Sequence, residues 1–342
     1  MCGSYVMTIR ETIEEIEKQT LSPYAVYSAD SKGRMRPEAQ DDLRPVFQRD
    51  RDRILHSKSF RRLKDKTQVF LTPQGDHYRT RLIHTLEVSQ NARTIAKALR
   101  LNEDLVEAIA LGHDLGHTPF GHAGERALNR VCSLGFEHSE QSLRVVDVLE
   151  KDMCGLNLTS EVRDGILNHR SRGNPSTLEG KIVQYSDKIA YMHHDMDDAI
   201  RAGILADDSV PPSIGEIAGY KTAERLDYFI HDIITESIDR DEIRMSEPAA
   251  KAMKELREWM FKNVYTNPKA KSEEGKAESL VESLYMYFFN RPDRLPMEYR
   301  ELMARTNDPL EKIVCDYISS MTDRYAISIY SDLFVPVSWS VK

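Results

Sequence analysis

The chain has 342 residues, of which 40% are hydrophobic and 30% charged, so it can bury one large core or two ordinary ones. Its formal net charge of -8 argues against a general affinity for nucleic acid, because contacts to the phosphate backbone need a surplus of Lys and Arg. No apolar run reaches the roughly 18 residues of a membrane span, and the four cysteines form no C-x-x-C pair. We therefore expect a soluble protein of the reducing cytoplasm, without a disulfide framework or a thiolate zinc site.

The apolar positions recur with a helical period along nearly the whole chain. Residues 1–30 predict one amphipathic helix followed by an arm. Another helix continues from His84, and a further one begins after Asn102, which can cap its N-terminus. Apolar residues predict three more helices, which pass through Leu143, Val146 and Leu149, through Val162, Ile166 and Leu167, and through Ile182, Ile189 and Met192. Because alternating strand patterns are scarce, the sequence predicts an all-α fold.

Segments rich in glycine, proline and polar residues interrupt these helices. They predict loops at 71–76, 172–175, 207–215 and 266–275. The last of these is polar enough to be a linker. We therefore divide the chain into an N-terminal helix and arm (1–48), a main helical domain (49–262) and a C-terminal helical subdomain packed on that domain (263–342).

Basic side chains are dense between Lys32 and Lys66, where Lys and Arg are twice as frequent as acids. Such a run is typical either of a solvated helix face or of an anion-binding surface. The composition of the run does not decide between the two.

Two histidines and two aspartates stand out as candidate metal ligands. They are His84 in RLIHTLEV, the adjacent His113 and Asp114 in ALGHDLGH, and Asp187 in QYSDKIAY. Two imidazoles and two carboxylates suit a divalent first-row metal ion, and water can fill any open position. Each motif taken alone is also typical of a surface histidine or of a satisfied core residue.

The segment 113–125, HDLGHTPFGHAGE, holds three histidines and two acids among small residues. Gly116, Gly121 and Gly124 allow backbone or ligand to approach closely, which a purely structural helix end would not require three times. We interpret the segment as an active-site loop between two helices.

The order His…His-Asp…Asp resembles the HD superfamily of metal-dependent phosphohydrolases. Longer strings look like its deoxyguanosinetriphosphate triphosphohydrolase-like branch. These are ILHSKSFRRLKDKTQVF from Ile54, HDLGHTPFGHAGE from His113, GFEHSEQSL from Gly135 and GKIVQYSDKIAYMHHDMDDAI from Gly180. The resemblance is strong from residue 49 to 203 and extends into the C-terminal helices, so the main domain is expected to be an HD domain.

The resemblance implies that one divalent metal ion, of Mn, Mg, Fe, Ni, Co or Zn, is held by His84, His113, Asp114 and Asp187. It implies that water attacks the α-phosphorus of a deoxynucleoside triphosphate (dNTP) and releases deoxynucleoside and inorganic triphosphate. Relatives are commonly oligomers with nucleotide activators, so a homo-oligomer and a nucleotide effector are expected.

The resemblance also implies a catalytic pair, His122 and Glu125, with His117 and His138 as pocket histidines that assist or orient. The spacing of His122 and Glu125 agrees with such a pair, because residues three apart lie on the same face of a helix. A helix N-terminus would depress the pKa of His122, whereas a neighbouring carboxylate would raise it and fix the tautomer. Our hypothesis is that His122 protonates the leaving 5′-oxygen.

Tyr191 and Asp195 follow Asp187 at i+4 and i+8 and so lie on one helix face. In the family the matching residues line the sugar pocket, where the acid meets the 3′-hydroxyl and the Tyr excludes a 2′-hydroxyl. A polar helix face with an ordinary core Tyr remains the alternative.

A triphosphate also needs cations other than the metal ion. Arg81 and Lys188 resemble phosphate-binding residues of the family, and Gln68 resembles a residue that touches the sugar. With the resemblance in view, the basic run from Arg53 to Lys66 is expected to face substrate.

Two other readings stay open. One is an HD enzyme of another substrate class, such as a nucleoside monophosphate phosphatase or a cyclic-nucleotide phosphodiesterase. The other is a non-catalytic sensor of nucleotides or single-stranded nucleic acid, which would not need the pair His122 and Glu125.

Overall fold

The computed structural model describes residues 7–68, 79–206, 209–267 and 273–336. Within these ranges the chain is helical, and its only β-structure is two isolated bridges, so the all-α prediction is confirmed. The loop expected at 71–76 lies outside the described residues. None of the described helices combines the length and apolar character of a membrane span.

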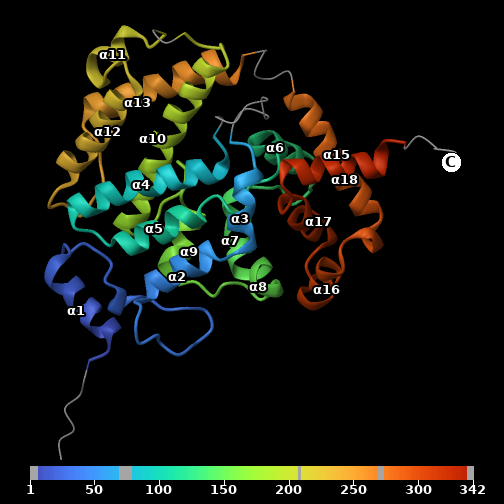
Figure 1. The fold of residues 1–342 in the computed structure, drawn as a ribbon, viewed down its shortest axis with the longest axis horizontal. Coiled ribbons are helices and arrows are strands. Elements are labelled where there is room, and N and C mark those ends of the chain that lie inside the picture. Colours follow the sequence, from blue (N-terminus) through green and yellow to red (C-terminus); the bar gives the residue numbers. More distant parts are fainter. Residues whose placement is uncertain (1–6, 69–78, 207–208, 268–272, 337–342) are drawn as a thin grey trace, which may run out of the picture.

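The chain up to residue 201 forms an N-terminal helix, α1, and the helices that carry the candidate metal-ligand motifs (Figure 1). Its elements are α1 (Ile9–Thr20), η1 (Ser28–Asp30), α2 (Val46–Leu55), α3 (Lys58–Arg62), η2 (Leu63–Asp65), α4 (Arg81–Leu99), α5 (Glu103–Gly112), α6 (Gly121–Val131), α7 (His138–Arg144), η3 (Val145–Leu149), α8 (Glu150–Met153), α9 (Ser160–Leu167) and α10 (Leu178–Arg201).

The second half adds helices at two opposite ends of the molecule, with α11 to α13 at one end and α15 to α18 at the other (Figure 1). Its elements are α11 (Pro212–Ala218), α12 (Thr222–Ser237), α13 (Glu247–Met260), η4 (Phe261–Tyr265), α15 (Glu274–Asn290), η5 (Pro292–Arg294), α16 (Met297–Thr306), α17 (Leu310–Ser319) and α18 (Asp323–Phe334).

The long helix α10 packs along α4 and α5, and this trio carries the metal-ligand motifs. Side chains cap the N-termini of α5 and α10: Asn102 accepts from the backbone N–H of Leu105, as predicted, and Thr177 accepts from that of Gly180. The apolar faces meet in a core that also takes residues from α2, α9, α12 and α13. The helix ends that carry the candidate metal ligands are therefore held by well-packed helices.

The helix expected through Leu143, Val146 and Leu149 is confirmed, since α7 continues without a break into the π-helical turn η3, and it ends where α8 begins. Lys151 and Asp152 have φ of 52° and 54°, in the left-handed region that side chains rarely adopt. A regular helix cannot continue through two such residues, so the helical segment that holds Leu143, Val146 and Leu149 ends before them.

A second core lies between α6 and helices α15 to α18. Ala127 and Leu128 of α6 are fully buried there, as are Val281 and Leu284 of α15. The C-terminal helices thus pack directly on the helix that carries His122 and Glu125.

Buried polar contacts tie the C-terminal helices to the loop after α5. The ammonium group of Lys66 donates to the carbonyl oxygens of His117 and Ser319, the latter at 2.6 Å. The Asp323 carboxylate accepts from the backbone N–H of Phe120 at 2.9 Å and from that of Thr67 at 3.1 Å. These contacts fix the backbone of the loop from behind.

We expect Asp323→Ala to lower the free energy of unfolding by about 2–4 kcal/mol, because two N–H groups lose a charged acceptor in a buried setting. Denaturant unfolding would measure the change. The control is Asp332→Ala, an exposed carboxylate on the same helix, which should change stability by less than about 0.5 kcal/mol. Equal effects of the two substitutions would contradict the role given to Asp323.

Candidate active site

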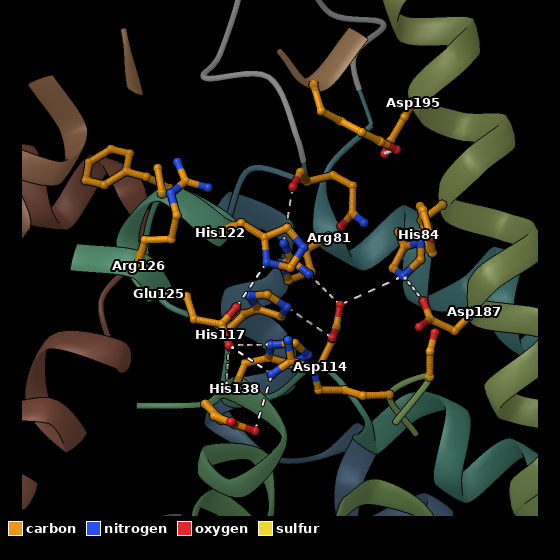
Figure 2. Close-up of a pocket in the computed structure, with 18 of the residues that line it drawn as sticks. Arg81, His84, Asp114, His117, His122, Glu125, Arg126, His138, Asp187 and Asp195 are labelled. Carbon is orange, nitrogen blue, oxygen red and sulfur yellow. Dashed lines mark hydrogen bonds and ion pairs between the residues drawn. The ribbon is translucent and has the colours of Figure 1, made fainter. Parts of the chain in front are cut away.

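A cavity of about 750 Å³ opens between α4, α6, α10 and the segment from α13 to η4 (Figure 2). Its size suits a small organic ligand. Most of the residues singled out from the sequence line it, namely Gln68, Arg81, His84, Asp114, His117, His122, Glu125, His138, Asp187, Tyr191 and Asp195. His113 is fully buried beside them, whereas Lys188 does not line the cavity.

The four candidate metal ligands converge from three places in the chain. His84 Nε2 lies 3.2 Å from Asp187 Oδ1 and 3.8 Å from Asp114 Oδ2. His113 Nε2 lies 3.5 Å from Asp114 Oδ1 and 3.9 Å from Asp187 Oδ1. Ligand atoms at about 2.0–2.2 Å from one metal ion are separated by roughly 2.9–4.3 Å, so the distances suit a shared ion.

The hydrogen bonding of His113 also fits a metal ligand. Its Nδ1–H donates to the carbonyl oxygen of Ala110 at 2.6 Å, which leaves the lone pair on Nε2. That Nε2 atom is buried and has no hydrogen-bond partner. A buried acceptor without a partner is costly, and a metal ion would satisfy it.

The charge states favour ligation as well. Burial lowers the pKa of His84, which keeps the ring neutral and able to ligate. Burial would raise the pKa of Asp187, but the contact with His84 and the neighbouring imidazoles bring that pKa down to about 2. The two side chains are thus in the forms that bind a cation.

His194 lies behind the first ligand and was given no role from the sequence. Its Nδ1 is 3.5 Å from His84 Nδ1, and its Nε2 is 2.6 Å from Glu87 Oε2. Outer partners of this kind orient metal-bound histidines. The i+7 spacing from Asp187 on α10 could have placed His194 on the ligand face.

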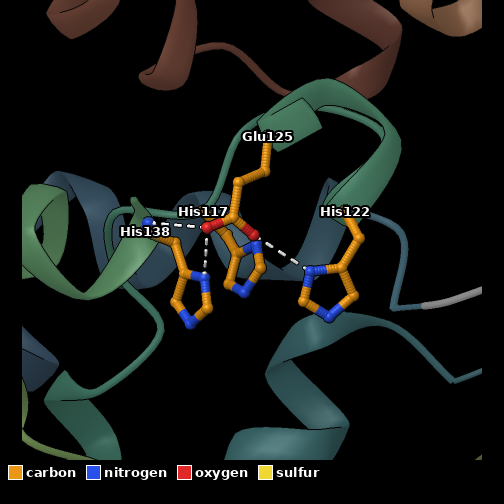
Figure 3. Close-up of side chains that lie close together, drawn as sticks. All are labelled: His117, His122, Glu125 and His138. Carbon is orange, nitrogen blue, oxygen red and sulfur yellow. Dashed lines mark hydrogen bonds and ion pairs between the residues drawn. The ribbon is translucent and has the colours of Figure 1, made fainter. Parts of the chain in front are cut away.

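The predicted pair His122 and Glu125 is formed, and Glu125 joins it to His138 (Figure 3). His122 Nδ1 lies 3.0 Å from Glu125 Oε2, and His138 Nδ1 lies 2.9 Å from Glu125 Oε1. Burial alone would raise the pKa of Glu125, but the bonds from His122 and His138 hold it well below its ordinary value. Glu125 is therefore a fixed anion that orients two imidazoles.

His122 and His117 differ sharply in environment. The side chain of His122 is 60% exposed, at the second position of α6. His117 is buried, and its ring stacks on that of His138 with centroids 3.9 Å apart. Burial, followed by the charge of Arg81, puts the pKa of His117 well below its ordinary value. Only His122 of the two is open to exchange a proton with a ligand in the cavity.

The glycines of the segment 113–125 are used for close backbone contacts. A Cβ at Gly116 would collide with the backbone of Gln141 and Ser142. Gly121 begins α6 with a φ of 54°, and a Cβ there would lie 3.0 Å from the carbonyl oxygen of Gln68. The helix therefore starts at Gly121, and the loop proper is 113–120.

Tyr191 and Asp195 form one wall of the cavity together with Tyr265 of η4. Tyr265 Oη donates to Asp195 Oδ2 at 2.5 Å, while Asp195 Oδ1 is buried without a partner. Burial raises the pKa of Asp195 to about 8 and that of Tyr191 to about 12. The wall thus offers a carboxyl group with one free oxygen beside two neutral phenols.

The cations of the cavity differ in part from those predicted. Arg81 donates to Asp114 Oδ2 at 2.5 Å and to the Gln68 carbonyl oxygen at 3.2 Å. Burial, followed by the nearby charge of Arg257, lowers the pKa of Lys188. Four arginines that the sequence did not single out line the cavity, namely Arg126, Arg170, Arg172 and Arg257.

The basic run from Arg53 to Lys66 contributes nothing to the cavity lining. Arg53 pairs with Glu38 and with carbonyl oxygens, and Arg62 donates to Ser59. The expectation that this run faces substrate is corrected, because Arg53 and Arg62 are engaged by other protein groups and no member of the run lines the cavity.

Two family models match the chain. The HD domain matches residues 81–192, and the phosphohydrolase-associated domain matches residues 243–332. A phosphohydrolase structure from Bacteroides thetaiotaomicron shares the fold, with a TM-score of 0.51, 18% identity and coverage of 82% of this chain and 68% of that one.

Curated relatives match over nearly their whole length and are named deoxyguanosinetriphosphate triphosphohydrolase-like proteins. The one from Caldanaerobacter subterraneus is 55% identical over 97% of this chain and 98% of its own. Those from Desulfatibacillum aliphaticivorans and Clostridium perfringens are 49% and 47% identical, each over 96% of this chain and 99% and 98% of their own.

Proposed function

Since this chain belongs to the deoxyguanosinetriphosphate triphosphohydrolase-like family of HD-domain hydrolases, we propose that it cleaves deoxynucleoside triphosphates into deoxynucleoside and inorganic triphosphate. The observation that carries the proposal is the convergence of His84, His113, Asp114 and Asp187 beside the pair His122 and Glu125 in one cavity. A metal centre and a proton donor side by side suit the hydrolysis of a phosphate ester with a poor leaving group.

The four ligands would hold one divalent metal ion, which when bound supplies Lewis acidity and a water of lowered pKa. Around that position the chain's own residues do the binding and orienting. Arg81 lies against Asp114, so its guanidinium borders the metal position. A phosphate oxygen there would meet both a cation and the Arg81 donors.

His122 would supply the proton for the 5′-oxygen of the leaving deoxynucleoside. With Nδ1–H bound to Glu125, the proton that a charged ring can give away sits on Nε2. The 60% exposure of His122 supports access of that atom to substrate. Glu125 acts as a positioning residue, because it fixes the tautomer without touching the reacting atoms.

The wall formed by Tyr191, Asp195 and Tyr265 would bind the deoxyribose. The unpartnered oxygen of Asp195 can bond to the 3′-hydroxyl, and the buried amide oxygen of Gln68 also lacks a partner. Arg81, expected from the sequence, would bind the triphosphate, with the cavity arginines Arg126 and Arg257 as further cations. Lys188 does not line the cavity, so its phosphate contact stays a prediction from the resemblance.

The test is to incubate the purified protein with each dNTP, singly and mixed, with Mn²⁺ or Mg²⁺, and to separate the products by ion-exchange chromatography. Release of inorganic triphosphate and deoxynucleoside is the expected result. Orthophosphate or pyrophosphate would move the enzyme to another substrate class, and no turnover under any mixture would favour a nucleotide sensor. Turnover only in mixtures would reveal the expected effector.

Tyr191→Ala is expected to lower discrimination between a dNTP and the matching ribonucleotide by about 10-fold or more, because the ring no longer fills the space of a 2′-hydroxyl. The ratio of kcat/KM for the two nucleotides measures it. Tyr185→Ala is the control, a half-buried Tyr on the same helix that packs on the core. An unchanged ratio in Tyr191→Ala would remove this residue from sugar selection.

A further inference from the structure

A second cavity, of about 420 Å³, borders the segment 132–137, which joins α6 to α7. Phe136 and Glu137 line both this cavity and the larger one that holds the candidate metal ligands. His138 follows them directly and lines the larger cavity. The segment is therefore a wall shared by two cavities, and a change on one side of it can reach the other.

Two cysteines that the proposed reaction does not use meet at the second cavity. Cys132 ends α6 and Cys315 lies on α17, with residue exposures of 4% and 3%. Both line the cavity, and the Cys315 thiol hydrogen-bonds to the sulfur of Cys132. One belongs to the segment matched by the HD domain and the other to the segment matched by the phosphohydrolase-associated domain. The tertiary fold thus brings two thiols together from the two matched regions.

Glu311 of α17 fixes Cys132 beside Cys315. Its Oε2 accepts from Cys132 Sγ at 3.6 Å, from the backbone N–H of Ser133 at 2.7 Å and from the Ser133 hydroxyl at 2.8 Å. Glu311 lies one helical turn before Cys315, so the two residues share the face of α17 that meets the end of α6. The carboxylate holds Cys132 in place and is positioned to take its proton.

The two thiols differ in how easily they lose a proton. Cys132 sulfur accepts from the Cys315 thiol and from the backbone N–H of Leu134. These bonds, the one from Cys315 first, lower the pKa of Cys132 below its ordinary value, although burial acts in the opposite direction. The same hydrogen bond, followed by burial, raises the pKa of Cys315. Cys132 is thus poised as a nucleophile next to a thiol that stays protonated.

We propose that Cys132 and Cys315 form a redox-sensitive dithiol that hydroperoxides convert into a disulfide. The Cys132 thiolate attacks one peroxide oxygen and becomes a sulfenic acid as the O–O bond breaks. The other oxygen leaves as water or an alcohol, with the proton that Cys132 gave to Glu311. The Cys315 thiol then attacks the sulfenic sulfur, the S–S bond forms, and the sulfenic oxygen leaves as water. Two thiols are oxidised and one hydroperoxide is reduced, so the electrons balance.

The disulfide would move the wall between the cavities. Disulfide sulfurs lie about 2.05 Å apart, closer than two thiols in hydrogen-bond contact, so the end of α6 must shift toward α17 when the bond forms. The segment that starts at Cys132 leads to His138, which is hydrogen-bonded to Glu125. Oxidation therefore changes the larger cavity whatever reaction that cavity performs, and reduction by a thiol reverses the change.

Peptide mapping tests the proposal without any nucleotide or metal ion, so it stands apart from the test of the proposed reaction. A full chain with Cys2→Ser and Cys154→Ser keeps only Cys132 and Cys315, and it is treated with hydrogen peroxide and digested without reductant. The expected result is a disulfide-linked pair of peptides, the use of about one peroxide per chain, and full reversal by dithiothreitol. Amide hydrogen exchange of residues 133–138 should slow on oxidation and recover on reduction.

The key variant is Cys315→Ser, which keeps a hydroxyl donor beside Cys132 but removes the second thiol. Once its circular-dichroism spectrum shows that it is folded, it should accumulate a sulfenic acid at Cys132 that dimedone traps, with no slowing of hydrogen exchange. Cys154 of the unaltered chain is the matched control, an exposed cysteine that should react with peroxide about 10-fold more slowly than Cys132. Oxidation of Cys154 ahead of Cys132, or the absence of the linked peptides after exhaustive treatment, would overturn the proposal.

Discussion

His113→Ala should abolish metal binding at the four-ligand site and lower dNTP turnover by more than about 100-fold. Loss of an outer partner alone typically costs about 10- to 100-fold, and His113 is a proposed ligand itself. Its Nε2 is buried, has no hydrogen-bond partner, and lies within 3.9 Å of oxygens from both Asp114 and Asp187. Elemental analysis of the purified protein and a triphosphate-release assay would measure the two effects.

His193→Ala is a matched control for this substitution. His193 is also fully buried, its Nδ1 donates to the Ile189 carbonyl oxygen at 2.6 Å, and its Nε2 also lacks a partner. Its ring packs against Phe229 rather than against another ligand. Both variants should lose stability through a cavity, but only His113→Ala should lose the metal ion. A folded His113→Ala protein with its full metal content would contradict the ligand assignment.

The second large effect is expected for His122→Ala, in which kcat should fall by about 10²- to 10⁴-fold while metal content and stability stay unchanged. The 60% exposed side chain leaves no buried cavity when it is removed, so a loss of activity reports on chemistry and not on folding. Single-turnover kinetics of triphosphate release would measure the loss.

Two comparisons sharpen this prediction. His56→Ala removes an exposed histidine at the end of α2 and should have no effect on kcat. Glu125→Gln keeps an acceptor for His122 Nδ1 but removes the charge, so it should retain part of the activity. Full turnover in His122→Ala would show that another group protonates the leaving oxygen.

The sequence predicted the helices around the cavity from their apolar period, whereas the convergence of the four candidate metal ligands was expected from the resemblance to HD phosphohydrolases. His113 and Asp114 are neighbours in the chain, and the helical period puts Asp187, Tyr191 and Asp195 on one face of α10. His122 and Glu125, three residues apart on α6, meet as that spacing predicts.

The parts that the sequence did not reveal depend on packing between distant segments. His169 meets His138 because α9 ends beside the start of α7, and no local spacing links the two residues. Arg257 and Tyr265 reach the cavity from α13 and η4, more than sixty residues beyond Asp187. Such contacts follow from the tertiary fold and leave no periodic signal in the chain.

The density of basic residues in the sequence was a poor predictor of which side chains face the cavity. The run ending at Lys66 looked suited to anions, yet Lys66 is fully buried and donates to two carbonyl oxygens. Burial, followed by the charge of Arg62, puts its pKa well below the ordinary value for lysine. The tertiary structure determines which groups lie next to a basic side chain. A run of basic residues in the sequence therefore does not by itself identify a phosphate-binding site.

The contacts of Lys66 and Asp323 bear on how this chain can be recombined. Two separate family models cover residues 81–192 and 243–332, which invites treating them as interchangeable modules. Yet the loop that follows His113 is hydrogen-bonded to Asp323 directly and to Ser319 through Lys66. In addition, α6 shares its core with α15 to α18. A chimera that pairs this HD domain with a foreign C-terminal region would keep the candidate metal ligands but lose the contacts that hold the backbone beside them. We therefore expect the two regions to be exchangeable only as a pair, because each supplies contacts that the other needs.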